Sequence, residues 1–126
     1  MPSIQTVRIG VTTTGTAGAA TGSTTTETLF GELLDVFLDF HVSTPATTDT
    51  TIAYATGGAG VGNILVVTSS ATDARIAPRQ KCVDNANAAI TNSFDRFWLN
   101  GAITVSLAEA DALTDALVAY VRILRP

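Results

Sequence analysis

Three residues of types that bind metals or transfer protons share the odd-numbered positions of the stretch 34–42: Asp35, Asp39 and His41. In an extended strand such positions face one side, where carboxylates and an imidazole could bind a cation or act in acid–base catalysis. His41 is the only histidine of the chain and Cys82 the only cysteine, which leaves too few ligands for an ordinary zinc site. We therefore favour a solvated or interface face, and we predict no catalytic, cofactor-binding or metal-binding residues.

The stretch 34–42 alternates apolar and polar side chains more regularly than any other part of the chain. One face of the predicted strand carries Leu34, Val36, Leu38, Phe40 and Val42. A helical rotation of 100° per residue would scatter these side chains around the whole circumference. The pattern therefore predicts a core strand, and other strands must cover its apolar face.

Further stretches with strand-like composition supply those partners. They lie at 7–11, 50–56, 64–68, 94–99, 102–107 and 117–124. Asn100-Gly101, between two of them, is the strongest hairpin signal of the chain. Residues 109–115 could form one helical turn, and 81–93 either a helical turn or a loop. Without a long amphipathic helix, the predicted fold class is all-β, with an antiparallel β-sandwich or barrel-like domain.

The segment 12–28 is rich in Thr, Gly, Ala and Ser, and Glu27 is its only charged residue. Such a stretch buries little apolar area to offset the entropy lost on ordering. We predict an extended N-terminal Thr/Gly-rich arm or long loop at 12–26 that is ordered only where a partner chain supports it. The predicted division is an N-terminal strand and arm at 1–28, followed by a β-sandwich domain at 29–126.

A glycine-rich run at 57–62 invites comparison with a phosphate-binding loop. A nucleotide-binding loop of that kind lies between a strand and a helix, with a lysine or a later acidic residue in register. Here the glycines lead directly into the apolar run 64–68. We predict a hairpin connection between two strands instead.

Phe37 interrupts the polar face of the predicted central strand, where a large aromatic side chain needs cover. A neighbouring strand or the arm would cover it within the chain, and a second subunit would cover it at an interface. Arg75 and Arg79 flank Pro78 in a turn-rich segment. Arginine pairs bidentately with carboxylates across interfaces, although simple solvation also explains both. The candidate subunit-interface residues are therefore Phe37, Arg75 and Arg79.

The composition excludes some partners. A net charge of −4 and a pI near 4.6 argue against a direct nucleic-acid partner, which needs clustered basic residues. The N-terminus lacks the basic and apolar regions of a secretory signal, and no apolar run approaches the roughly 18 residues of a membrane span. We expect synthesis in a cytoplasm and no membrane partner. Only 14% of residues are charged, which suits a surface packed against copies of itself or a larger assembly.

Three phrases of the sequence are distinctive: TPATTDTTI at 44–52, TDARIAPR at 72–79 and NGAITVSL at 100–107. Together they resemble small structural proteins of tailed bacteriophages, among them capsid decoration or cement proteins, over roughly residues 34–124. The resemblance implies a β-rich domain that assembles as dimers or trimers on the outside of an icosahedral shell. There it would bridge subunits of the major capsid protein after expansion, and the resemblance implies no catalytic residue.

We therefore expect a non-enzymatic virion structural protein without cofactors, located on the capsid exterior, with the major capsid protein and itself as partners. One alternative is a head–tail joining or tail component. A second is a carbohydrate-binding module displayed on the virion, with Trp98, Tyr54 or Tyr120 as a stacking platform.

Overall fold

The computed structural model describes residues 2–55 and 62–126. Their regular structure consists of strands, without a helix. The strands are β1 (Ser3–Val11), β2 (Ala20–Thr25), β3 (Leu29–Phe40), β4 (Asp49–Tyr54), β5 (Asn63–Val67), β6 (Ala74–Ile76), β7 (Arg79–Val83), β8 (Ala89–Arg96), β9 (Trp98–Gly101), β10 (Ile103–Ala110) and β11 (Leu117–Arg125). The predicted all-β fold class is confirmed.

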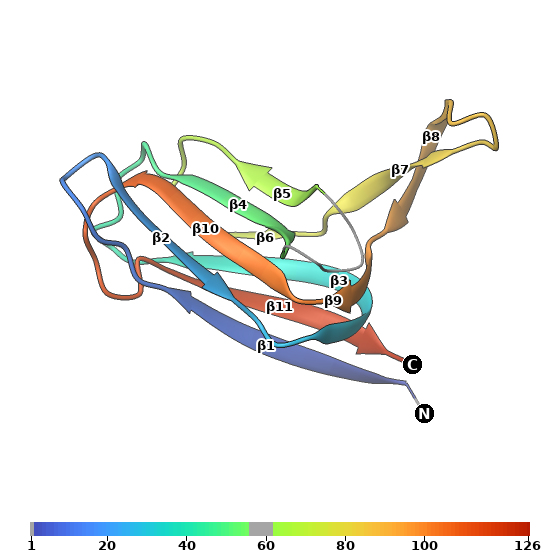
Figure 1. The fold of residues 1–126 in the computed structure, drawn as a ribbon, viewed down its shortest axis with the longest axis horizontal. Helices are drawn as coiled ribbons and strands as arrows, with labels where there is room; N and C mark the ends of the chain where they lie inside the picture. Colours follow the sequence, from blue (N-terminus) through green and yellow to red (C-terminus); the bar gives the residue numbers. More distant parts are fainter. Residues whose placement is uncertain (1, 56–61) are drawn as a thin grey trace.

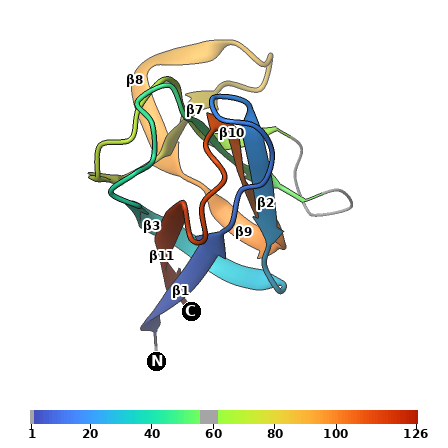
Figure 2. The same cartoon turned by 90° about the vertical axis from the view of Figure 1, so that its left-hand side faces the viewer.

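The strands form two antiparallel sheets and a separate hairpin. The first sheet has the order β1-β11-β3-β6, and β9 also pairs with β3. The second sheet has the order β2-β10-β4-β5, and β7 pairs only with β8. Figure 2 shows the sandwich end-on, with β1, β11 and β3 on one side and β2 and β10 on the other. Figure 1 shows the β7–β8 hairpin projecting away from both sheets.

Strand β3 lies in the middle of the first sheet, as predicted for the core strand. Its core side carries the buried side chains of Val36, Leu38 and Phe40. The prediction for Val42 is wrong, because β3 ends at Phe40 and Val42 is 96% exposed. A turn begins there, in which the Thr44 N–H donates to the His41 carbonyl at 2.9 Å.

The prediction for Leu34 is also wrong, because a β-bulge changes the alternation of β3. Arg122 of β11 lies opposite Asp35, and the next residue, Ile123, lies opposite Leu33. Leu34 is therefore the extra residue of the bulge. Leu33 takes the core position and is 1% exposed, whereas Leu34 is half-buried.

The core lies between the two sheets and is almost entirely aliphatic. The first sheet supplies alternate residues of its strands, and the second sheet supplies residues of β4, β5 and β10. The largest fully buried apolar side chains are Leu33, Leu38, Leu99, Leu117, Ile52, Ile103 and Ile123. Such cores are packed like organic crystals, so these side chains fix how the two sheets stack.

The Thr/Gly-rich segment differs from the expectation that only a partner chain orders it. Residues 20–25 form β2, which pairs with β10 of the same chain. Ala20 is fully buried, and the Thr24 hydroxyl donates to the Gly10 carbonyl at 2.7 Å. Threonine favours the extended backbone because it is β-branched. The chain's own β10 thus supplies a partner strand that composition alone does not reveal.

The hairpin predicted at Asn100-Gly101 is wrong. Strand β9 pairs with β3, whereas β10 pairs with β2 and β4. The chain passes from the first sheet to the second at Gly101, where φ is 149°, a conformation that favours glycine. Leu99 is fully buried, so the pairing of β9 with β3 also completes the core.

The two segments with a possible helical turn contain none. Residues 79–96 form the β7–β8 hairpin, and β10 continues through Ala110 before a loop leads to β11. The Asp84 side chain accepts hydrogen bonds from the N–H groups of Ala86 and Ala88 at 2.8 and 3.0 Å, and Asn87 has a φ of 62°. Asp and Asn stabilise turns in this way.

Strands β4 and β5, on either side of the glycine-rich run 57–62, pair antiparallel. Residues 57–61 lie outside the described residues, and so does the hairpin connection predicted for them in place of a phosphate-binding loop.

We predict that Thr50→Val stabilises the fold by about 1 kcal/mol. Thr50 is fully buried, and its hydroxyl has no hydrogen-bond partner among the described residues. Thr48 provides the matched control, because it is equally buried but donates to the Pro45 carbonyl at 2.8 Å. Thr48→Val should therefore destabilise the fold by about 1 kcal/mol. Urea unfolding measures both variants, and equal effects of the same sign would contradict the prediction.

Candidate interaction surface

Asp35 lies on the outer side of the first sheet, in the middle of β3, and its side chain is held by two arginines. The Nε of Arg122 donates to Oδ1 of Asp35 at 2.9 Å, and Nη2 of Arg122 donates to Oδ2. Arg75 of β6 adds a bond from Nη1 to Oδ1 at 3.2 Å. Both carboxylate oxygens are thus used by guanidinium groups, so Asp35 joins β3, β6 and β11.

The charge state of Asp35 follows from these contacts. The hydrogen bonds from Arg122 lower the pKa of the carboxyl below its ordinary value of 3.8, although burial opposes them. The positive charges of Arg122 and Arg75 lower the pKa further. Asp35 is therefore a carboxylate at neutral pH, with a structural role as the anion of an ion-pair network.

Asp39 and His41 do not join Asp35 in a common site. His41 lies beyond the end of β3, and its Nδ1 accepts a hydrogen bond from the Ser43 N–H at 3.0 Å. Within residues 2–55 and 62–126, no three His, Cys, Asp or Glu side chains are grouped so as to hold a metal ion.

Phe37 and Arg75, two of the candidate interface residues, are in contact. The guanidinium carbon of Arg75 lies 5.3 Å from the centroid of the Phe37 ring, a cation–π distance. On the other side of Phe37, the Tyr120 ring lies 6.4 Å away, centroid to centroid. Arg8 of β1 lies opposite Tyr120 in the strand register. We call Arg8, Tyr120, Phe37 and Arg75 the arginine–aromatic row; neighbouring strands of this chain thus cover part of Phe37.

Arg79, the third candidate, lies elsewhere. It opens β7, and its Nη1 donates to the carbonyl of Pro78 at 2.9 Å. Its register partner is Arg96 of β8, which pairs with Glu32 at 3.0 Å. The structure thus places Arg79 at the root of the β7–β8 hairpin and outside the arginine–aromatic row.

The β7–β8 hairpin is the most exposed apolar element of the described chain. Val83, Ile90 and Phe94 are 50%, 47% and 57% exposed. Ile90 and Phe94 also border a hollow of about 300 Å³ on the hairpin. Sequence reasoning missed this element, although Asp84 to Asn87 carries turn chemistry between two extended runs. An isolated two-stranded hairpin is marginally stable in water, so burial of these side chains would stabilise it.

A second exposed aromatic group lies where β3 meets β9. Phe30 and Trp98 are 43% and 48% exposed and meet edge to face, with ring centroids 5.3 Å apart. Tyr54 of the second sheet donates its hydroxyl to the Trp98 carbonyl at 3.2 Å, and burial raises the pKa of Tyr54. Tyr120 belongs to the arginine–aromatic row. Only Trp98 of the three predicted stacking residues is strongly exposed.

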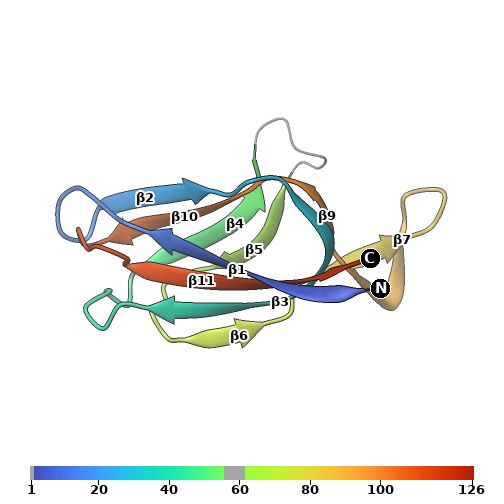
Figure 3. The same ribbon diagram turned by 90° about the horizontal axis from the view of Figure 1, so that it is seen from below.

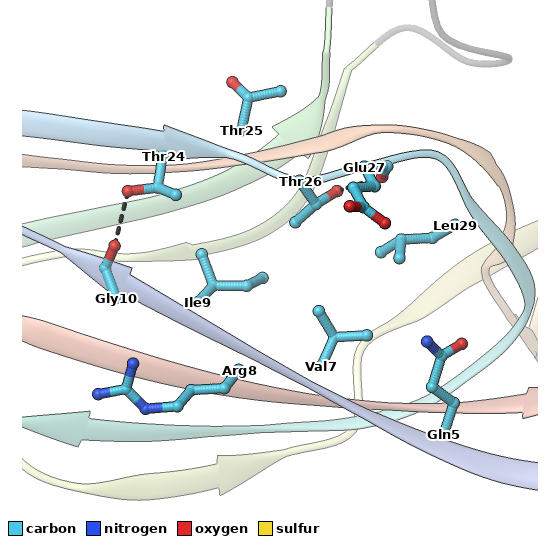
Figure 4. A pocket seen from close by; sticks show the side chains of 10 residues that line it. All are labelled: Gln5, Val7, Arg8, Ile9, Gly10, Thr24, Thr25, Thr26, Glu27 and Leu29. Carbon is cyan, nitrogen blue, oxygen red and sulfur yellow. Dashed lines mark hydrogen bonds between the residues drawn. The ribbon is translucent and has the colours of Figure 1, made fainter.

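A groove lies between the two sheets, at the side where β1 and β2 are the edge strands (Figure 4). Its volume is about 280 Å³. Val7 and Ile9 of β1 point into it, and Thr26 and Leu29 border it from the other side. The hydrogen bond from Thr24 to the Gly10 carbonyl joins the two edges at one end of the groove.

No protein family, curated protein or solved structure matches this chain. No helix long and apolar enough to cross a membrane occurs in the part of the chain that the structure describes.

Proposed function

We propose that this chain is a non-enzymatic virion structural protein that decorates and stabilises a bacteriophage capsid from outside by bridging subunits of the major capsid protein. The resemblance of the phrases at 44–52, 72–79 and 100–107 to phage head proteins supports the class of protein. The β7–β8 hairpin carries the argument for an interaction role, because it projects from the sandwich with three exposed apolar side chains (Figure 1).

In this proposal the hairpin is the main contact with the shell. Large exposed aromatic residues dominate binding energy when a partner buries them, so Phe94 would be the central contact. Arg79 at the root of the hairpin would lie at the rim, where charged residues mainly direct docking. Each contact is small, but many copies on one shell bind at a high effective concentration, and their contributions to shell stability add.

Co-sedimentation with shells assembled from the major capsid protein encoded beside this chain, before and after expansion, tests the proposal. We expect binding that saturates at a fixed ratio to capsid subunits, on expanded shells only. Phe94→Ser should weaken this binding at least about tenfold without changing the thermal unfolding midpoint. Phe30→Ser is the matched control, since Phe30 is also exposed but lies on the sandwich, and it should bind like the original protein.

Absence of binding to both forms of the shell would overturn decoration and favour a head–tail joining or tail component. Electron microscopy of the isolated protein adds a second readout, because a closed ring or a stacked tube would also contradict decoration. A carbohydrate-binding module ranks below both, because only the exposure of Trp98 supports it. A glycan array without signals above background would contradict this alternative.

A further inference from the structure

The edge strand β1 lacks the features that usually keep sheet edges from pairing. Of the edge strands, β6 and β9 have three and four residues, and β2 and β5 meet their neighbours with register shifts. Strand β1 has nine residues, and its register with β11 is unbroken from Ser3 to Val11. Short length, bulges and inward-pointing charges protect natural edges. The one charged residue of β1, Arg8, instead lies on the outer face, 3.8 Å from Asp115.

The backbone groups on the open side of β1 can be identified. The Gly10 carbonyl accepts from Thr24 of β2 and therefore points away from β11. In an antiparallel ladder, the N–H and C=O of every second residue point to the same side. Those of Ile4, Thr6 and Arg8 thus face the open edge as well. None of these three has a backbone hydrogen-bond partner on this open side in the described residues.

We propose that a second copy of this chain pairs with this edge, β1 against β1, antiparallel about a two-fold axis at Thr6. In this register Thr6 lies opposite Thr6 of the second copy, and Ile4 lies opposite Arg8. Every open N–H and C=O of these residues then finds a partner, and the two first sheets become one continuous sheet. The interface is isologous, as in most dimers.

Two observations favour this register over a shift towards the end of β1. Pairing centred on Arg8 would place like charges opposite each other, which is destabilising. It would also require the Gly10 carbonyl as an acceptor for the second copy, but this carbonyl already accepts from the Thr24 hydroxyl. Centring on Thr6 keeps the pairing over 3–9, beside the groove of Figure 4. Gln5 of each copy lies opposite Val7 of the other, on the groove side of the combined sheet, so side-chain contact adds to the hydrogen bonds.

Thr6→Pro is the sharpest test, measured by sedimentation velocity over a concentration series. We expect the unsubstituted chain to dimerise and Thr6→Pro to weaken the dimer at least about tenfold, because proline removes one N–H donor from each side of the axis. Since that N–H points away from β11, the monomer should keep its thermal midpoint, as for proline at sheet edges. Thr6→Ala keeps the N–H and should dimerise within about twofold of the original chain.

A crosslink provides an independent readout. Opposite residues of a hydrogen-bonded pair have Cα atoms about 5.5 Å apart, within disulfide range. In a Cys82→Ser background, Thr6→Cys should therefore form a covalent dimer under mild oxidation. Ile4→Cys is the control, because Ile4 lies about 14 Å along the strand from its symmetry mate. A chain that stays monomeric at all concentrations, or a dimer that neither substitution at Thr6 affects, would overturn the proposal. Neither readout involves the capsid, so the proposed function stands or falls separately.

Discussion

Replacing Gly31 by alanine should destabilise the fold by about 2–4 kcal/mol. Gly31 has a φ of 142°, which residues with a side chain rarely adopt. An added Cβ would lie 2.6 Å from Cγ2 of Ile123 and 2.6 Å from the carbonyl oxygen of Leu124. Because the second atom belongs to the backbone of the neighbouring strand β11, a rotation of a side chain cannot relieve the contact.

Gly18→Ala separates the backbone strain from the steric overlap. Gly18 also has a positive φ, 79°, but nothing lies within 4 Å of a Cβ placed there. Only the conformational cost applies, so we expect about 1–2 kcal/mol. Urea unfolding of both variants gives the comparison. Equal losses would show that β3 and β11 move apart freely at Gly31, contrary to our prediction.

Asp35→Asn should cost about 2 kcal/mol at neutral pH. The substitution keeps the size of the side chain but removes the charge that binds Arg122 and Arg75. Removing one partner of a fully buried ion pair would cost more stability. Here both arginines are about half exposed, so water solvates them once the carboxylate is gone. Asp39→Asn is the control, since Asp39 lies on the same strand face and has no ion pair among the described residues.

The loss on Asp35→Asn should depend on pH in one direction. The pKa of Asp35 lies below 3.8 in the folded protein, so the folded state holds this proton less tightly than the unfolded chain does. The stabilisation is therefore fully present above the unfolded pKa and disappears as the pH falls through the folded pKa. Urea unfolding at neutral pH and at successively lower pH checks this. A difference between the variant and the original chain that stays constant down to pH about 2 would contradict it.

Local patterns predicted the fold class well, because alternation reports directly which side chains a strand buries. Phe40 is an example, since both of its neighbours in sequence, Asp39 and His41, are polar. The features that were predicted wrongly depend on which distant segments pair, and local patterns do not report this pairing. The bulge at Leu34 depends on the register with β11. The hairpin predicted at Asn100-Gly101 does not form, because β9 pairs with β3.

The sequence identified single residues of the candidate surface, but not the contacts between them. Phe37 was a candidate because an aromatic side chain breaks a polar face, and Arg75 because it is an arginine in the turn-rich segment around Pro78. Their contact depends on β6 docking against β3 in one register, which neither segment specifies alone. The β7–β8 hairpin escaped prediction because its side chains find no core to face, so its strands lack the clean alternation of β3.

The position of β11 has a consequence for how the protein is made. The last strand of the chain lies between β1 and β3, and Arg125 pairs with Ser3 (Figure 3). A ribosome therefore delivers both neighbours of β11 long before the strand that joins them. Until β11 emerges, β1 and β3 offer unpaired edges to other nascent chains, and contacts this distant in sequence form slowly. Loss of β11 would thus remove the middle of a sheet, and termination before this strand should yield aggregates instead of a trimmed domain.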